Sequence, residues 1–347
     1  MELSFLKKIT NNDLFQSMLA LGIICVVTSF AVEETQIFPL SILLLLLNLF
    51  SSVQDIGVDS LAVNILTEHE LGAGNTIQVV AYKAGSMFAG SLLLFVRESF
   101  GWTVMFLAFA SIYFLAIFLL NLINISEKKT KIEKVENLPL KQELWKLFQV
   151  KGTFWMMFFV LFYKLCERSE QSFALYLVDK KVAREELALL STFIRAFSII
   201  GSFLSGLILT KRTNSAKILI IIFAIIRAFG ILGMTFVIMN WEPFDYSNFY
   251  KHLGYFCINL TSISAGGITT ATFTLMMKVS QNAPENCQGT HYSLLATCEV
   301  LGKLLFAAVA GYMIDLYGLQ IIFAFFTLLG FSVIPTALFA PNYVKED

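Results

Sequence analysis

Charged residues are scarce in this sequence, and their scarcity excludes most classes of soluble protein. Asp, Glu, Lys and Arg make up 14% of the 347 residues, whereas a soluble domain is about one quarter charged. Hydrophobic residues make up 57%, and the mean hydropathy is +0.72. A chain of this composition has too little polar surface to cover itself in water, which excludes a water-soluble enzyme and a disordered chain. We therefore predict an integral membrane protein whose surroundings are the lipid bilayer.

An excess of basic charge is also missing. Lys and Arg number 25, and so do Asp and Glu, so the formal net charge is zero. A protein that binds the phosphate backbone of DNA or RNA needs a positive field. The balance of charges therefore predicts that nucleic acid is not a partner.

Several motifs that carry enzymatic chemistry are absent. The sequence has no GxxxxGK[ST] phosphate loop, no HExxH zinc motif and no CxxC pair, so neither an ATP-driven pump nor a metal centre is predicted. No nucleophile is paired with a base. The prediction is a protein without a cofactor, without a metal and without an enzymatic activity. The cysteines are expected to be small buried side chains, and they are Cys25, Cys166, Cys257, Cys287 and Cys298.

Long apolar runs dominate the chain. A membrane-spanning helix needs about 20 apolar residues, and the short alternating strands of a membrane β-barrel are not seen. The fold class predicted is therefore an all-α membrane bundle. Ten spans are expected, at 14–31, 38–66, 75–96, 102–123, 152–178, 185–209, 218–239, 253–278, 290–313 and 319–339.

The distribution of positive charge predicts the orientation. Most Lys and Arg residues outside the spans lie in segments on the same side as Lys7, Lys8 and Lys345, although the turn at 179–184 opposes this bias. Cytosolic loops carry the excess of positive charge. Both termini of this multi-pass protein are therefore expected in the cytosol.

One polar linker, 125–151, divides the chain. Its Lys/Glu run is followed by Leu140, Leu144, Leu147 and Phe148, a spacing typical of an amphipathic helix on the membrane surface. The predicted organisation is a half-bundle of four spans at 1–124, the cytosolic linker, and a bundle of six spans at 152–347.

Ionisable and polar residues inside the spans are the candidate site. Such residues are costly in a bilayer and are functional candidates by default. We expect one set of side chains to attract an anionic solute or line its path: Lys83, Lys164, Arg195, Lys303, Tyr82, Tyr163, Gln54 and Gln78. A second set is expected to carry a coupling proton or balance these cations: Asp55, Asp59, Glu167 and Glu299.

A structural role is the alternative for some of these charges. Helix rise places Asp55 or Asp59 level with Lys83 on the next span, and Glu299 and Lys303 are spaced i, i+4 on one helix. Both sets can form internal salt bridges that lock helices together. For Arg227 the structural role is favoured, although the sequence offers it no obvious partner.

Several segments resemble a known family. Val53–Asp59 (VQDIGVD) resembles the QDxxxD signature of the acetyl-coenzyme A transporter group of the major facilitator superfamily. Similar matches lie at Asn75–Val79 with Ala81–Gly85, at Tyr163–Glu167 (YKLCE), and at Gly289–Leu295 (GTHYSLL). The resemblance extends from about residue 45 onward, and AmpG-type muropeptide permeases are more distant relatives. It implies a monomeric, multi-pass secondary transporter that works by alternating access, with acetyl-CoA as substrate and protons as the coupling ion.

The chain departs from this family in two respects. Family members have twelve helices, and the ten expected here correspond to the third to the twelfth. Lys83 stands where the family has Arg, and Cys166 where it has Gly; Lys lacks the fork of donors that Arg presents. Two alternatives therefore stay open. One is a truncated, non-transporting membrane protein. The other is a transporter of another solute, such as a muropeptide, a sugar conjugate or a peptide.

Overall fold

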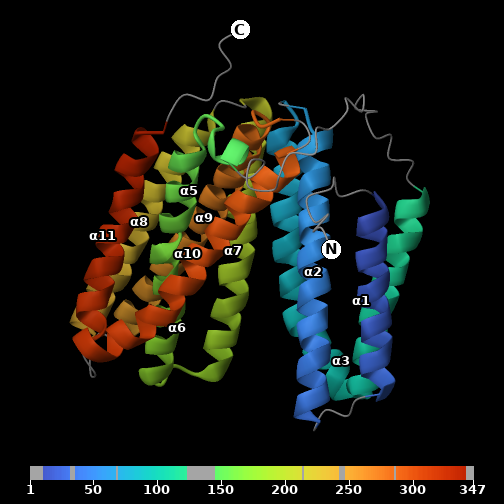
Figure 1. The fold of residues 1–347 in the computed structure, drawn as a ribbon. Helices are drawn as coiled ribbons and strands as arrows, with labels where there is room; N and C mark the ends of the chain where they lie inside the picture. Colours follow the sequence, from blue (N-terminus) through green and yellow to red (C-terminus); the bar gives the residue numbers. More distant parts are fainter. Residues whose placement is uncertain are drawn as a thin grey trace. The chain divides into compact units, whose positions relative to one another are not determined.

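The computed structural model describes residues 11–31, 36–67, 69–122, 145–212, 215–241, 247–284 and 287–340. Within these ranges the secondary structure is helical and contains no strand, as the composition predicted. The main helices, drawn in Figure 1, are α1 (Asn11–Ala31), α2 (Ile37–Ile65), α3 (Leu71–Leu122), α5 (Thr153–Phe162), the 3₁₀ turn η2 (Leu165–Glu167), α6 (Arg168–Asp179), α7 (Arg184–Lys211), α8 (Ala216–Asn240), α9 (Ser247–Ser280), α10 (Gln288–Tyr317) and α11 (Leu319–Leu338).

All ten expected spans are occupied by helix. Within the described residues, seven helical segments are long and apolar enough to cross a membrane. The other three expected spans are the first part of α3, the interrupted segment α5–η2–α6, and α9. The helix α3 contains two of the expected spans. Between them Gly101 adopts a φ of 87°, which bends the chain. A φ in this region favours glycine, which has no Cβ.

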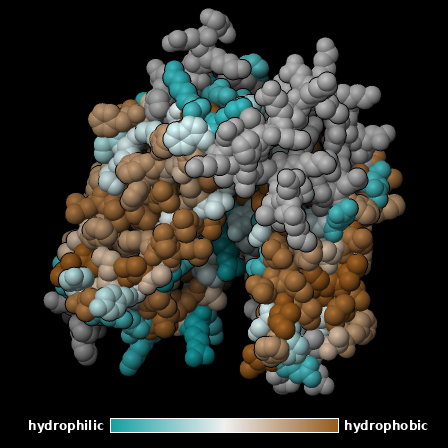
Figure 2. All heavy atoms as spheres, viewed as in Figure 1, coloured by the Kyte–Doolittle hydropathy of each residue, from teal (hydrophilic) through white to brown (hydrophobic). Residues whose placement is uncertain are grey.

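Hydrophobic side chains cover much of the exposed surface. Figure 2 shows them along the sides of the helices, while hydrophilic residues gather toward helix ends. Phe30 is 70% exposed, Leu45 69% and Leu328 69%. In water such a surface would aggregate, whereas in a bilayer it faces lipid. The surface therefore agrees with a multi-pass membrane protein.

The chain forms two compact units. The first comprises Met1–Ile65, Gly85–Leu144 and Ala283–Ser293. In it α1 packs against α2, and the second part of α3 is tied to α1 by two hydrogen bonds. The Trp102 indole donates to the Thr28 carbonyl at 3.4 Å, and the Thr103 hydroxyl donates to the Ser29 carbonyl at 3.2 Å.

The second unit comprises Leu66–Ala84, Trp145–Asn282 and Leu294–Asp347. In it α9 packs against α7 and α8, and α8 packs against α11. The first part of α3 belongs here because Asn75 donates to the Thr270 carbonyl at 2.8 Å and to the Thr274 hydroxyl at 2.9 Å. The two units thus interleave along the chain, and the contiguous boundaries expected from the sequence stay a prediction.

The linker is described only at its end. Residues 125–144 lie outside the described ranges, so the amphipathic helix stays a prediction there. At the described end Leu147 is buried, and its carbonyl accepts a hydrogen bond from Thr153 at 3.3 Å. Phe148 is half-buried and contacts the ring of Phe154. All five cysteines are free thiols, and the prediction of buried side chains is confirmed for four of them, whereas Cys287 is half-buried.

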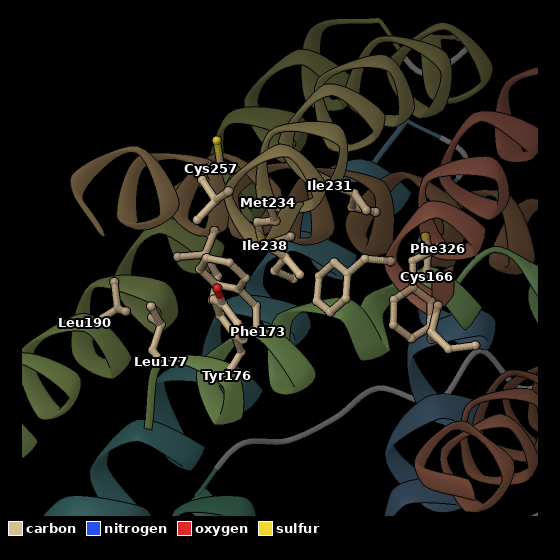
Figure 3. Close-up of a cluster of buried hydrophobic side chains, with 14 residues drawn as sticks. Cys166, Phe173, Tyr176, Leu177, Leu190, Ile231, Met234, Ile238, Cys257 and Phe326 are labelled. Carbon is tan, nitrogen blue, oxygen red and sulfur yellow. The ribbon is translucent and has the colours of Figure 1, made fainter. Parts of the chain in front are cut away.

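A hydrophobic core holds α6 in place. Figure 3 shows Phe173 and Leu177 of α6 among side chains from α7, α8, α9 and α11. Phe173 and Leu177 are fully buried, as are Ile231, Met234 and Phe326 that belong to the same core. This packing fixes the rotation of α6, and with it the direction of the polar residues at the start of that helix.

Two glycines allow α7 and α9 to approach closely. A Cβ at Gly201 would overlap the backbone of Ile263, and a Cβ at Gly266 would overlap the backbone of Ser198. We expect G201A and G266A each to lower the free energy of unfolding by about 1–3 kcal/mol, because the helices must separate. Denaturant unfolding in detergent measures this, and G311A is the control, since a Cβ at Gly311 meets no atom within 4 Å. Equal stability of G201A and G311A would contradict the close approach.

Candidate functional site

The helix at 152–178 is interrupted where its charged residues lie. The α-helix α5 ends at Phe162, a 3₁₀ turn spans Leu165–Glu167, and α6 resumes at Arg168. An interruption in a bilayer frees backbone groups that must find other partners. The freed Tyr163 carbonyl accepts a hydrogen bond from Arg227 Nη2 of α8 at 2.7 Å.

Arg227 is fully buried and has two partners at this interruption. Its second partner is Glu167, whose Oε1 lies 3.4 Å from Arg227 Nη1. The side chain of Arg227 is 0% exposed and that of Glu167 is 20% exposed. The structure thus supplies the partner that the sequence did not reveal, and the structural role favoured for Arg227 stays a prediction.

Lys164 and Tyr163 both converge on Glu299 of α10. The Lys164 ammonium forms an ion pair with Glu299 Oε1, with 12% and 6% of the two side chains exposed. The Tyr163 hydroxyl donates to the same oxygen at 3.2 Å. The sequence offered Lys303 as the salt-bridge partner of Glu299, but the structure pairs Glu299 with Lys164. Lys303 is exposed instead.

Lys83 is held by two serines of α7. Its ammonium donates to Ser198 Oγ at 2.8 Å, to Ser202 Oγ at 2.9 Å and to the Ser198 carbonyl at 3.4 Å. It also interacts electrostatically with Lys164 and with carboxylates at the start of α6. The expected pairing of Lys83 with Asp59 or Asp55 stays a prediction.

Glu170 is a functional candidate that the sequence reasoning missed. Its Oε2 accepts a hydrogen bond from the Ser262 hydroxyl of α9 at 3.2 Å. Its Oε1 is buried and has no hydrogen-bond partner among the described residues. Its position in the sequence could have identified it. Glu170 follows Glu167 by three residues, which places it one turn further along the same face of a membrane helix.

Six of these charged side chains form what we call the ionic cluster. They belong to the second unit and come from α3, α8, α10 and the interrupted helix. With all six ionised, the three positive and three negative charges cancel, so the cluster is neutral. No group of His, Cys, Asp or Glu in the described residues could hold a metal ion. The members are Lys83, Lys164, Arg227, Glu167, Glu170 and Glu299.

The other predicted site residues differ in their exposure. In the second unit Arg195 is exposed on α7, and neither it nor Lys303 has an ion pair or hydrogen bond within the described ranges. Gln78 is half-buried, and Tyr82 is 77% exposed on α3. In the first unit, α2 carries Asp55, which is exposed, and Gln54 and Asp59, which are half-buried.

Comparison with known proteins decides the family. Residues 14–302, which are most of the chain, match the family described as the Major Facilitator Superfamily. The chain belongs to the Major Facilitator Superfamily. This membership agrees with a multi-pass membrane protein that has the helix-bundle fold predicted from its sequence.

Two proteins similar to this chain are bacterial. An uncharacterised protein of Haemophilus influenzae is 30% identical over 200 residues, which cover 55% of this chain and 46% of that protein. The anhydromuropeptide permease of Escherichia coli K12 is 22% identical over 294 residues, 84% of this chain and 58% of the permease. The chain thus spans about half the length of these relatives.

A solved structure supports the same fold. The Major Facilitator Superfamily transporter FucP, crystallised in the outward conformation, superposes with a TM-score of 0.76 at 14% identity. The superposition covers 95% of this chain and 83% of FucP. At 14% identity the similarity shows the fold alone. It does not identify the solute.

Proposed function

We propose that this chain is a proton-coupled carrier of an organic anion that works by alternating access. The ionic cluster at the interrupted helix carries the proposal. Interrupted helices near mid-membrane mark the binding sites of secondary transporters, and charges buried there need a functional reason. We further propose that the chain acts as a monomer with both termini in the cytosol.

The residues of the cluster have distinct roles in this proposal. Lys164 is the cation that meets the solute, because it lies at the interruption and is 12% exposed, so it is not sealed by protein. Arg195 and Lys303 are exposed cations that draw the anion toward the second unit. Glu167 and Glu299 balance buried cations. On the first unit Asp55 and Asp59 provide two further carboxylates, whose role in this proposal is charge balance.

Two solutes are supported by different observations. Acetyl-CoA is supported by the QDxxxD-like segment at 53–59, where the chain also resembles major facilitator superfamily domain-containing protein 3. An anhydromuropeptide is supported by the identity to the E. coli permease of that name. Both are large polar anions, so either is compatible with cations at the interrupted helix.

Uptake into proteoliposomes tests the proposal. Purified chain is reconstituted and offered labelled acetyl-CoA or labelled anhydromuropeptide, with the outside more acidic than the inside. We expect uptake of one solute above protein-free liposomes, and its loss when a protonophore dissipates the gradient. If folded protein transports neither solute by uptake or by exchange, the chain is instead a non-transporting membrane protein or carries a different solute.

A further inference from the structure

The carboxyl group of Glu170 differs from the two other carboxylates of the ionic cluster. Glu299 is paired with Lys164, and Glu167 is paired with Arg227. Glu170 has a neutral partner, the Ser262 hydroxyl, and its Oε1 is buried without a partner among the described residues. A buried polar atom that lacks a hydrogen bond is costly and calls for an explanation.

Charged groups act on Glu170 from three elements of the second unit. Glu167 of η2 repels its negative charge, while Arg227 of α8 and Lys83 of α3 attract it. Of the helices packed against α6, α9 contributes the neutral Ser262, and α11 has no ionisable side chain. On α7, Arg195 is the charged residue between the two ends of the helix, and it is exposed and is not among the groups that act on Glu170.

We propose that Glu170 is the residue that binds the coupling proton, and that its protonation prepares the ionic cluster for an anion. This inference rests on the proposed transport function and assigns one step of it to a residue. The proton forms an O–H bond at Oε1 and leaves again as H⁺, so no other bond is made or broken. Protonation removes the negative charge from a buried carboxyl group whose Oε1 has no donor among the described residues to stabilise it.

The pairing of the other carboxylates explains why the proton belongs on Glu170. A proton on Glu299 or Glu167 would break an ion pair and strand a buried cation, which is strongly unfavourable. A proton on Glu170 breaks no ion pair. It leaves the three cations of the cluster facing two carboxylates, a net charge of +1 that one negative charge of the solute can neutralise. Proton binding and anion binding thereby favour each other.

Transport by E170Q tests the coupling. Glutamine keeps the shape of the protonated side chain but cannot exchange a proton. We expect E170Q to retain solute exchange at equilibrium, with no dependence on pH, and to lose accumulation driven by a proton gradient. The matched control is E185Q, because Glu185 is an exposed carboxylate at the start of α7. Gradient-driven accumulation by E170Q at the wild-type level would overturn the assignment.

Infrared titration tests protonation without any solute. In purified protein we expect the carbonyl stretch of a protonated carboxyl group that titrates with pH, that disappears in E170Q and that persists in E185Q. S262A keeps the carboxyl group but removes its hydrogen-bond donor, so the frequency of the same band should shift. If E170Q fails to fold, the frequency shift in S262A still tests the assignment of the band to Glu170.

The two measurements separate the failure of this inference from failure of the proposed function. A titrating band that neither E170Q nor S262A alters, or the absence of any such band, would overturn the role of Glu170 even if the chain transports solute. A band assigned to Glu170 in a chain that transports neither probe would support the proton site and contradict the choice of solutes.

Discussion

R227M is expected to lower the free energy of unfolding by about 3–5 kcal/mol, because breaking a buried ion pair strands its partner. Arg227 is fully buried and pairs with Glu167. It also donates to the Tyr163 carbonyl at the interruption between α5 and α6. Methionine has a similar volume, so the loss comes from the two missing interactions rather than from a cavity. Unfolding by denaturant in detergent measures the effect.

A control and a double variant separate charge pairing from packing. R168M removes an arginine five residues away from Tyr163 that donates an exposed hydrogen bond to Gln171, so it should change stability little. R227M/E167Q removes both charges and should recover part of the loss, because no uncompensated buried charge remains. If R227M is as stable as R168M, the interruption does not depend on Arg227.

K164M is expected to reduce the rate of solute uptake by about 30-fold or more, since removing one member of a desolvated charge pair costs about 2 kcal/mol or more. The change removes the cation proposed to meet the solute and leaves Glu299 without its ion pair. Initial rates of uptake into proteoliposomes, normalised to the amount of folded protein, measure it. K211M is the control, because Lys211 is exposed at the end of α7.

The double variant K164M/E299Q distinguishes a solute contact from a structural pair. Removing both charges restores neutrality, so a purely structural pair would let the double variant regain transport and abundance. If Lys164 contacts the solute, the double variant stays as slow as K164M. Normal uptake by K164M itself would show that neither role is required.

The positions of the helices follow from local sequence. A run of about 20 apolar residues can satisfy its backbone in a bilayer only as a helix or within a closed barrel, so all ten expected spans are helical. The bend at Gly101 also has a local cause, because glycine tolerates its positive φ. The interruption at Tyr163–Glu167 has no such cause, since this segment contains neither Pro nor Gly. Its Tyr163 carbonyl is bound by Arg227, which lies 64 residues away in the sequence.

The members of the site were partly predictable, and their partners were not. Charged residues in an apolar span are conspicuous, which is why Lys83, Lys164, Glu167 and Glu299 were identified from the sequence. The i, i+4 spacing suggested that Glu299 pairs with Lys303. Spacing along one helix cannot reveal a competing partner that another helix supplies. Glu299 pairs with Lys164 of a different helix because the packing of the second unit buries these two together and leaves Lys303 exposed.

By itself the sequence determined that this is a helical membrane protein with no net charge, because those properties depend on composition and local pattern. Only the tertiary structure decided that Arg227 supports an interrupted helix, that the ionic cluster is electrically neutral, and that Glu170 has a buried oxygen without a partner. The physical reason is that pairing and desolvation depend on distances between residues far apart in the chain, and these exist only once the helices have packed.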